Sequence, residues 1–115
     1  MAKHNGYGGG FGGGNMQNML RQAQKIQEEM QAAQAKLQET EFEGNGGGEL
    51  VKVVMTGDKN VVSVTIKPEA VDPDDIEMLE DLITAALQDV VAKIDAETAR
   101  VMGPYAGLLG GGLLG

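Results

Sequence analysis

Few side chains in this sequence could do chemistry, and most of them are carboxylates. His4 is the only histidine and there is no cysteine, so a thiol site is excluded and a histidine-based catalytic or metal site is hard to build. The densest acidic group is Asp74, Asp75, Glu77, Glu80 and Asp81. These side chains could attract a divalent cation, but they lack the loop spacing of a calcium-binding EF-hand. A solvated helix face is the better interpretation, and we expect no enzyme activity, metal site or cofactor.

Cations form the second set of candidates, because they can contact anionic groups such as phosphates. The net charge is −8, and it arises in residues 69–115, since acidic and basic side chains balance in residues 1–68. This overall acidity is unusual for a nucleic-acid-binding protein. A polyanion would have to meet the first half of the chain. The candidate contacts there are Arg21, Lys25, Lys36, Lys52 and Lys67.

A β-hairpin over residues 50–66 is expected to position the two lysines in the middle of the chain. Two runs rich in β-branched residues flank a loop of turn formers, residues 57–60. The alternation puts apolar side chains on one face, which is predicted to be buried, and leaves Lys52 and Lys67 on the wetter face. The facing apolar pairs in this register are Met55 with Val62, Val53 with Val64 and Val51 with Ile66.

Two long helices are predicted to flank the hairpin. The first covers about residues 16–40, with Asn15 as candidate N-cap, and carries apolar residues at heptad spacing. These heptad residues are Met16, Met19, Ala23, Ile26, Met30, Ala33 and Leu37. The second is predicted to run from Asp72, as N-cap, to about Met102, where Gly103 and Pro104 end it. Its apolar stripe is the wider one, so it is the better cover for the hairpin.

The expected fold is α+β, in the order α-β-β-β-α. Residues 41–44 alternate polar and apolar side chains and predict a short third strand, followed by a glycine loop over 45–48. Residues 15–102 then form one domain. Residues 1–14 are predicted to be a disordered glycine-rich tail and residues 103–115 a flexible Gly/Leu-rich tail. Two exposed sheet edges and the heptad pattern both suggest a homodimer.

Five short stretches between about Asn15 and Met102 together carry a family signature. They are residues 19–27, 43–44, 50–53 with Gly57, 64–66 with Pro68, and 75–83. In this order they resemble the YbaB/EbfC family of bacterial nucleoid-associated proteins. The resemblance implies a tight α-β-β-β-α homodimer with helices splayed like tweezers. It also implies a cytoplasmic protein that binds double-stranded DNA on the nucleoid.

Two functions remain open from the sequence. In the first, a homodimer organises the nucleoid or regulates genes, and the five cations contact phosphates with little sequence preference. The competing interpretation of the helical cations is that they form ion pairs with Glu28, Glu29 and Glu39. In the second function, the acidic second helix and the Leu/Gly tail bind a protein partner in a scaffold. Neither function is expected to involve a small-molecule substrate or a membrane. No apolar run is long enough to span a bilayer, and glycines rather than an apolar stretch follow the first residues, so we expect no signal peptide.

Overall fold

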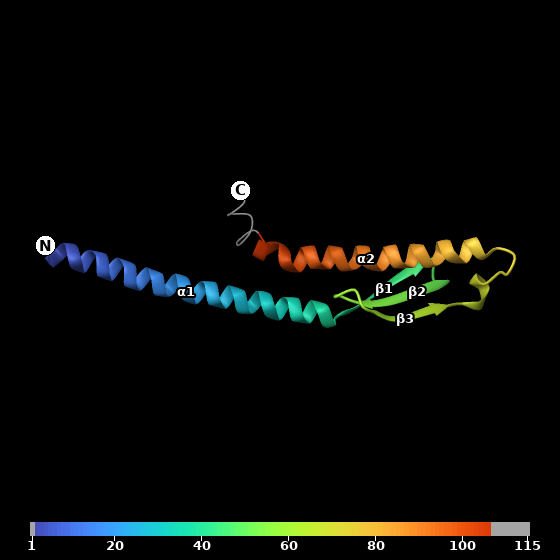
Figure 1. The fold of residues 1–115 in the computed structure, drawn as a ribbon, viewed down its shortest axis with the longest axis horizontal. Helices are drawn as coiled ribbons and strands as arrows, with labels where there is room; N and C mark the ends of the chain where they lie inside the picture. The colour runs from blue at the N-terminus through green and yellow to red at the C-terminus, as the bar shows by residue number, and fades with distance from the viewer. Residues whose placement is uncertain (1, 107–115) are drawn as a thin grey trace. The chain divides into compact units, whose positions relative to one another are not determined.

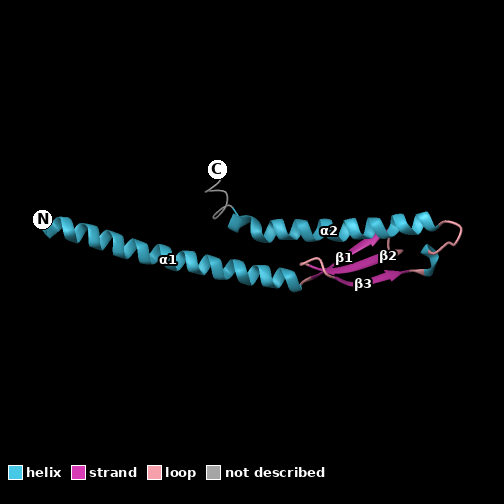
Figure 2. Cartoon of the chain, viewed as in Figure 1, coloured by secondary structure: helices cyan, strands magenta, loops and turns pink. Residues whose placement is uncertain are grey.

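The computed structural model describes the backbone of residues 2–106 and the side chains of residues 15–106. The elements are α1 (Ala2–Glu39), β1 (Glu41–Gly46), β2 (Val51–Thr56), β3 (Val61–Ile66), the short helix η1 (Pro68–Ala70) and α2 (Ile76–Ala106) (Figure 1, Figure 2). The sheet is antiparallel, in the order β1-β2-β3. The predicted α-β-β-β-α order is therefore confirmed. The chain divides into two units, with the boundary inside α1 between Ala32 and Ala33.

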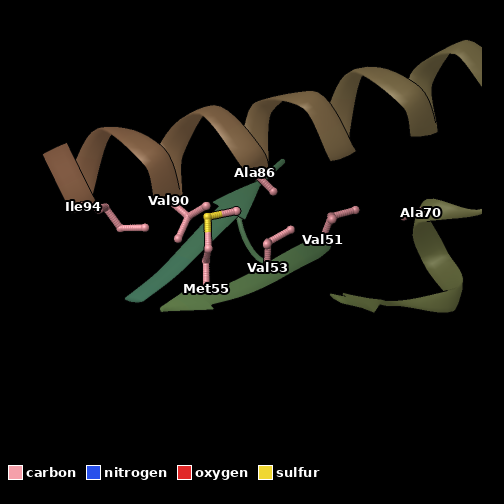
Figure 3. Close-up of a cluster of buried hydrophobic side chains, with 7 residues drawn as sticks. All are labelled: Val51, Val53, Met55, Ala70, Ala86, Val90 and Ile94. Atoms are coloured by element: carbon pink, nitrogen blue, oxygen red, sulfur yellow. The ribbon is translucent and has the colours of Figure 1, made fainter. Parts of the chain in front are cut away.

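The core lies between α2 and one face of the sheet. Side chains of β2 alternate between buried and half-buried, and the buried ones point toward α2 (Figure 3). Their partners on α2 recur every four residues, the spacing of one helix face. The buried cluster consists of Val51, Val53, Met55, Ala70, Ala86, Val90 and Ile94. The second helix therefore covers the sheet, as its apolar stripe predicted.

Two glycines of β1 let α2 pack against the strand backbone. Gly44 and Gly46 pair with Val53 and Val51, so both lie on the α2 side of the sheet. A Cβ added to Gly44 would overlap the carbonyl oxygen of Ala86 and lie 2.5 Å from the amide nitrogen of Val90. These pairings also correct the prediction of a loop from residue 45, because β1 continues to Gly46.

The outer edge of β1 is occupied by two side chains of α2. The Asn45 N–H donates to Oδ2 of Asp89 at 2.9 Å, and Nζ of Lys93 donates to the Glu43 carbonyl at 2.8 Å. Asp89 and Lys93 also form an ion pair at 3.2 Å. An edge strand otherwise presents unpaired N–H and C=O groups to other chains. These contacts therefore close one side of the sheet.

The contact with Asn45 makes the stability of the fold depend on pH. The Asn45 N–H, and then Lys93, hold the pKa of Asp89 below its usual value. A carboxyl with a lowered folded-state pKa stabilises the fold while it is ionised, and this contribution is lost as the pH falls below the ordinary value of about 4 toward the lowered one. We expect Asp89→Asn to melt at a lower temperature than the wild type at pH 7. On acidification from about pH 5 to pH 3, its Tm should fall less. Circular dichroism melts across this range test the prediction, and parallel Tm curves for the two proteins would contradict it.

β3 differs most from the prediction. Val64 faces Val53 and Ile66 faces Val51 as expected, but Met55 pairs with Val61 instead of Val62, because the register shifts after Val54. The predicted burial of β3 is also wrong for the single chain, since all six of its residues are exposed. A helix is about 10 Å wide and strands lie about 4.8 Å apart, so one helix covers about two strands. α2 packs on β1 and β2.

The helix ends also differ from the predicted ones. α1 begins at Ala2, well before residue 16. The glycines there lower helix propensity, but the segment has no proline or β-branched residue that would oppose a helix. Asp75 rather than Asp72 caps α2, because its Oδ1 accepts the N–H of Met78 at 3.2 Å.

The other end of α2 lies beyond the predicted stop. The helix continues through Gly103 and Pro104 to Ala106, because proline φ is compatible with a helix and its missing N–H removes only one hydrogen bond near the end.

Disorder of residues 1–14 and the domain limits at 15 and 102 stay predictions. Of the predicted C-terminal tail, residues 107–115 lie outside the described residues. Between residues 2 and 106, neither α1 nor α2 combines the length and hydropathy needed to cross a membrane.

Candidate nucleic-acid interface

The five candidate phosphate contacts lie on or next to three elements. Arg21 and Lys25 are one turn apart on α1, in the unit that ends at Ala32. Lys36 lies in the last turn of α1, Lys52 lies on β2, and Lys67 directly follows β3. These three belong to the other unit. The structure therefore groups Arg21 with Lys25 and does not gather all five into one site.

Ion pairing decides which of these cations can meet an external anion. Among the side chains of residues 15–106, the ion pairs are Lys52–Glu43, Lys59–Asp95, Lys93–Asp89 and Arg100–Glu97. The alternative pairing of the α1 cations with Glu28, Glu29 and Glu39 is not among them. Within this described set, Arg21, Lys25, Lys36 and Lys67 are all exposed and outside any ion pair. Four of the five candidates are therefore available to phosphates.

Lys52 is the least available of the five. It faces Thr65 on the side of the sheet away from α2, which is the predicted wetter face. Its Nζ lies 3.8 Å from Oε1 of Glu43, and both side chains are about half exposed. Such a pair contributes little to stability, so a phosphate could replace the carboxylate. The backbone of Lys67 is held to the sheet, because its N–H donates to the Leu50 carbonyl at 2.9 Å.

Arg100 is a neighbour of Lys36 that the sequence did not reveal. Both line a hollow of about 270 Å³ between the end of α1 and α2, together with Leu37, Thr40 and Glu97 among others. Arg100 donates to Glu97 at 2.8 and 2.6 Å. These hydrogen bonds lower the pKa of Glu97 and raise that of Arg100. Because the pair is neutral overall, Lys36 supplies the net positive charge of the hollow.

Gly57 brings the end of α1 to the turn between β2 and β3. Its N–H donates to the Thr40 carbonyl at 3.0 Å, and a Cβ there would overlap the carbonyl of Leu37. No residue pattern near Arg100 indicates that it lies beside Lys36, because this proximity depends on contacts between segments far apart in the chain.

Among the described residues, no group of three or more His, Asp or Glu side chains is placed to hold a metal ion.

Comparison of the sequence with known proteins shows the family of this chain. The model of the YbaB/EbfC DNA-binding family matches residues 12–109, which include all five candidate cations, the sheet and α2. The chain belongs to the YbaB/EbfC DNA-binding family. A nucleoid-associated protein of Clostridium botulinum is 52% identical over 113 residues, covering 98% of this chain and 99% of the relative. One from Streptococcus agalactiae is 47% identical over 93 residues, covering 81% and 94%. One from Ruminiclostridium cellulolyticum is 46% identical over 111 residues, covering 96% of each. The YbaB/EbfC assignment agrees with the resemblance carried by the sequence stretches.

Proposed function

We propose that this protein binds double-stranded DNA as a homodimer and acts on the bacterial nucleoid, in its organisation or in gene regulation. The observation that carries the proposal is membership of the YbaB/EbfC DNA-binding family, and similar proteins are named nucleoid-associated. Four exposed cations outside ion pairs supply the contacts. Phosphate contacts give affinity without reading bases, so little sequence preference is expected.

The acidic charge of the chain is compatible with this proposal because of where it lies. The acids around the start of α2, such as Glu80, are 20 residues along the helix from Arg100, a separation of about 30 Å. The Debye length at physiological salt is about 8 Å. Repulsion between those acids and a phosphate at Lys36 is therefore screened. Lys67 lies close in sequence to Glu69 and Asp72, so it is a weaker candidate for phosphate contact than Lys36.

We infer that the dimer forms through the apolar surface beside β3. Val61, Val64 and Ile66 pair with β2 residues that face α2, yet they are 55%, 50% and 37% exposed. Leu87 and Val91 of α2 line a shallow hollow of about 360 Å³. They lie on the side of α2 opposite Asp89 and Lys93, which hold β1, and therefore on the β3 side. We call Val61, Val64, Ile66, Leu87 and Val91 the β3 surface.

A second copy of the chain is the partner that fits the β3 surface. β3 is an edge strand with β2 on one side only, so its outer N–H and C=O groups are open to another strand. The β1 edge is closed by Asp89 and Lys93. Two-fold pairing of β3 with its own copy would join the two sheets and place the two β3 surfaces side by side, as an isologous interface requires.

The DNA contacts are tested by removing Arg21 and Lys25 together. We expect Arg21→Gln/Lys25→Gln to bind a labelled duplex of about 30 bp at least tenfold more weakly at low salt, by fluorescence anisotropy. The slope of log affinity against log salt should fall by up to about four, one for each phosphate that the variant dimer no longer neutralises. The dimer mass should not change.

The matched control adds the same net charge change on exposed positions of α2. Ala85→Glu/Ala96→Glu should weaken binding far less, because both exposed positions of α2 lie outside the set of candidate phosphate contacts. Equal weakening by the two double variants would mean that only total charge matters and would remove Arg21 and Lys25 from the interface. Absence of salt-sensitive binding by the wild type would favour the scaffold function, with the exposed acidic face of α2 as the partner surface.

A further inference from the structure

The stretch of α1 before Ala33 carries an exposed apolar seam. Its residues within this unit are Met16, Met19, Ala23, Ile26 and Met30. Met16 and Met19 are 63% and 67% exposed, and the adjacent Leu20 is 60% exposed. With Ala23 they line a shallow hollow of about 260 Å³ that has only apolar residue types around it. Large apolar side chains gathered in this way on an exposed helix mark a contact surface.

The spacing of the seam matches helix pairing. Steps of three, four, three and four residues from Met16 to Met30 keep the side chains on one face and follow a heptad. Large apolar side chains lie on both sides of the small Ala23 along it, which provides both knobs and a hole for an identical helix. Helices of this length gain most of their stability by packing an apolar face.

The charges beside the seam favour a second copy of the chain. The positions that flank a heptad seam are occupied here by Leu20, Gln22, Gln27 and Glu29. Three of these four side chains are uncharged. Two chains of net charge −8 can therefore approach each other at this seam with little local repulsion. Arg21 and Lys25 lie on the far side of the helix from the seam.

We propose that the seam pairs with the same seam of a copy from a second dimer, and that the paired helices hold two DNA duplexes. Pairing buries Met16, Met19 and Ala23 while Arg21 and Lys25 of each helix stay exposed and face away from the partner helix. The two cation rows then point in opposite directions, so each meets a different duplex. This second step rests on the proposed DNA binding, whereas seam pairing does not.

Seam pairing is tested without DNA by single-cysteine crosslinking. The chain has no cysteine, so Ala23→Cys introduces one thiol at the centre of the seam. Ala23 meets its own copy in an in-register parallel pair and in an antiparallel pair centred on it. Each thiol adds across one maleimide double bond of a short bis-maleimide, with no leaving group. We expect chains of doubled mass to form at least tenfold faster with Ala23→Cys than with Gln24→Cys, which lies off the seam. Equal rates would overturn the pairing.

Bridging is tested by capture of a second duplex. Wild-type protein on a bead-bound duplex should capture a free labelled duplex. Met16→Gln/Met19→Gln/Ala23→Gln, which leaves the charge unchanged, should capture at least fivefold less while its affinity for one duplex stays within twofold. Equal capture by the variant would overturn bridging through the seam. A wild type that binds no DNA would refute the proposed function instead, and the crosslinking rates would still decide the seam.

Discussion

Val64→Lys is expected to break the dimer that forms through the β3 surface. Val64 lies in the middle of the β3 surface, is half exposed in the single chain, and faces the buried Val53. In a two-fold interface the substitution removes two buried valines and inserts two charges that lose hydration. We expect the dimer to weaken by about 3 kcal/mol or more, a factor of roughly a hundred in Kd. Sedimentation velocity over a range of protein concentrations measures the change.

The control for this variant lies one residue away on the same strand. Ser63→Lys adds the same charge, but Ser63 faces Val54 on the side of the sheet away from α2. It should leave the dimer intact. Val64→Lys should also bind DNA with a smaller salt slope than the wild type, because a monomer offers half of the phosphate contacts. A Val64→Lys protein that associates as tightly as the wild type would place the dimer interface outside the β3 surface.

Gly44→Ala is expected to destabilise the fold strongly. The added methyl group would overlap the backbone of α2 at Ala86 and Val90, and backbone atoms cannot turn aside as the end of a side chain can. Either α2 moves off β1 or the strand bends. Overpacking typically costs about 1–3 kcal/mol, and we expect the upper end of that range or beyond, because the obstacle is backbone. That is a large share of the roughly 5–15 kcal/mol that stabilises a typical domain.

Urea unfolding followed by circular dichroism tests this prediction. Protein concentration must be held constant, because dimerisation stabilises the folded state by mass action. Gly103→Ala is the control: a Cβ there meets nothing within 4 Å, and the residue lies inside α2. It should raise the free energy of unfolding by up to about 1 kcal/mol through helix propensity. An unchanged urea midpoint for Gly44→Ala would show that α2 can shift at no cost.

Local patterns were sufficient to predict three strands and most of the register between β2 and β3. The alternation of β-branched residues correctly predicted the pairs Val53–Val64 and Val51–Ile66, because a slip of one residue would place Ser63 and Thr65 on the apolar face. The pair predicted for Met55 was wrong because the register shifts next to the turn. That turn is closed by the Thr56 N–H donating to the Asn60 carbonyl at 2.9 Å, with Lys59 at φ 67°. Hydrophobic periodicity carries no signal for such a bulge.

The exposure of β3 could not be predicted because it depends on where α2 sits across the sheet. Gly44 and Gly46 let the helix approach β1, and Asp89 and Lys93 hold it there. The helix is then too far to one side to cover Val64. The sequence shows that an apolar face exists, but the lateral position of its cover is a tertiary property.

The candidate cations were predictable as residue types but not as a site. Arg21 and Lys25 could be grouped from helical spacing alone. Which lysines would be held in ion pairs, and the position of Arg100 beside Lys36, depended on contacts between distant segments. DNA binding was suggested by the family resemblance, since an acidic chain does not indicate it by charge.

The contrast between the two sheet edges has a consequence for growth of the assembly. A subunit whose β1 edge is blocked by Asp89 and Lys93 can accept a neighbouring strand only once, at β3. When two subunits join there, both outer margins of the shared sheet are blocked ones, and strand addition terminates. Open strand margins are the templates from which fibrils extend. A protein that is monovalent in this respect can accumulate to high copy number in the cell without polymerising through its sheet.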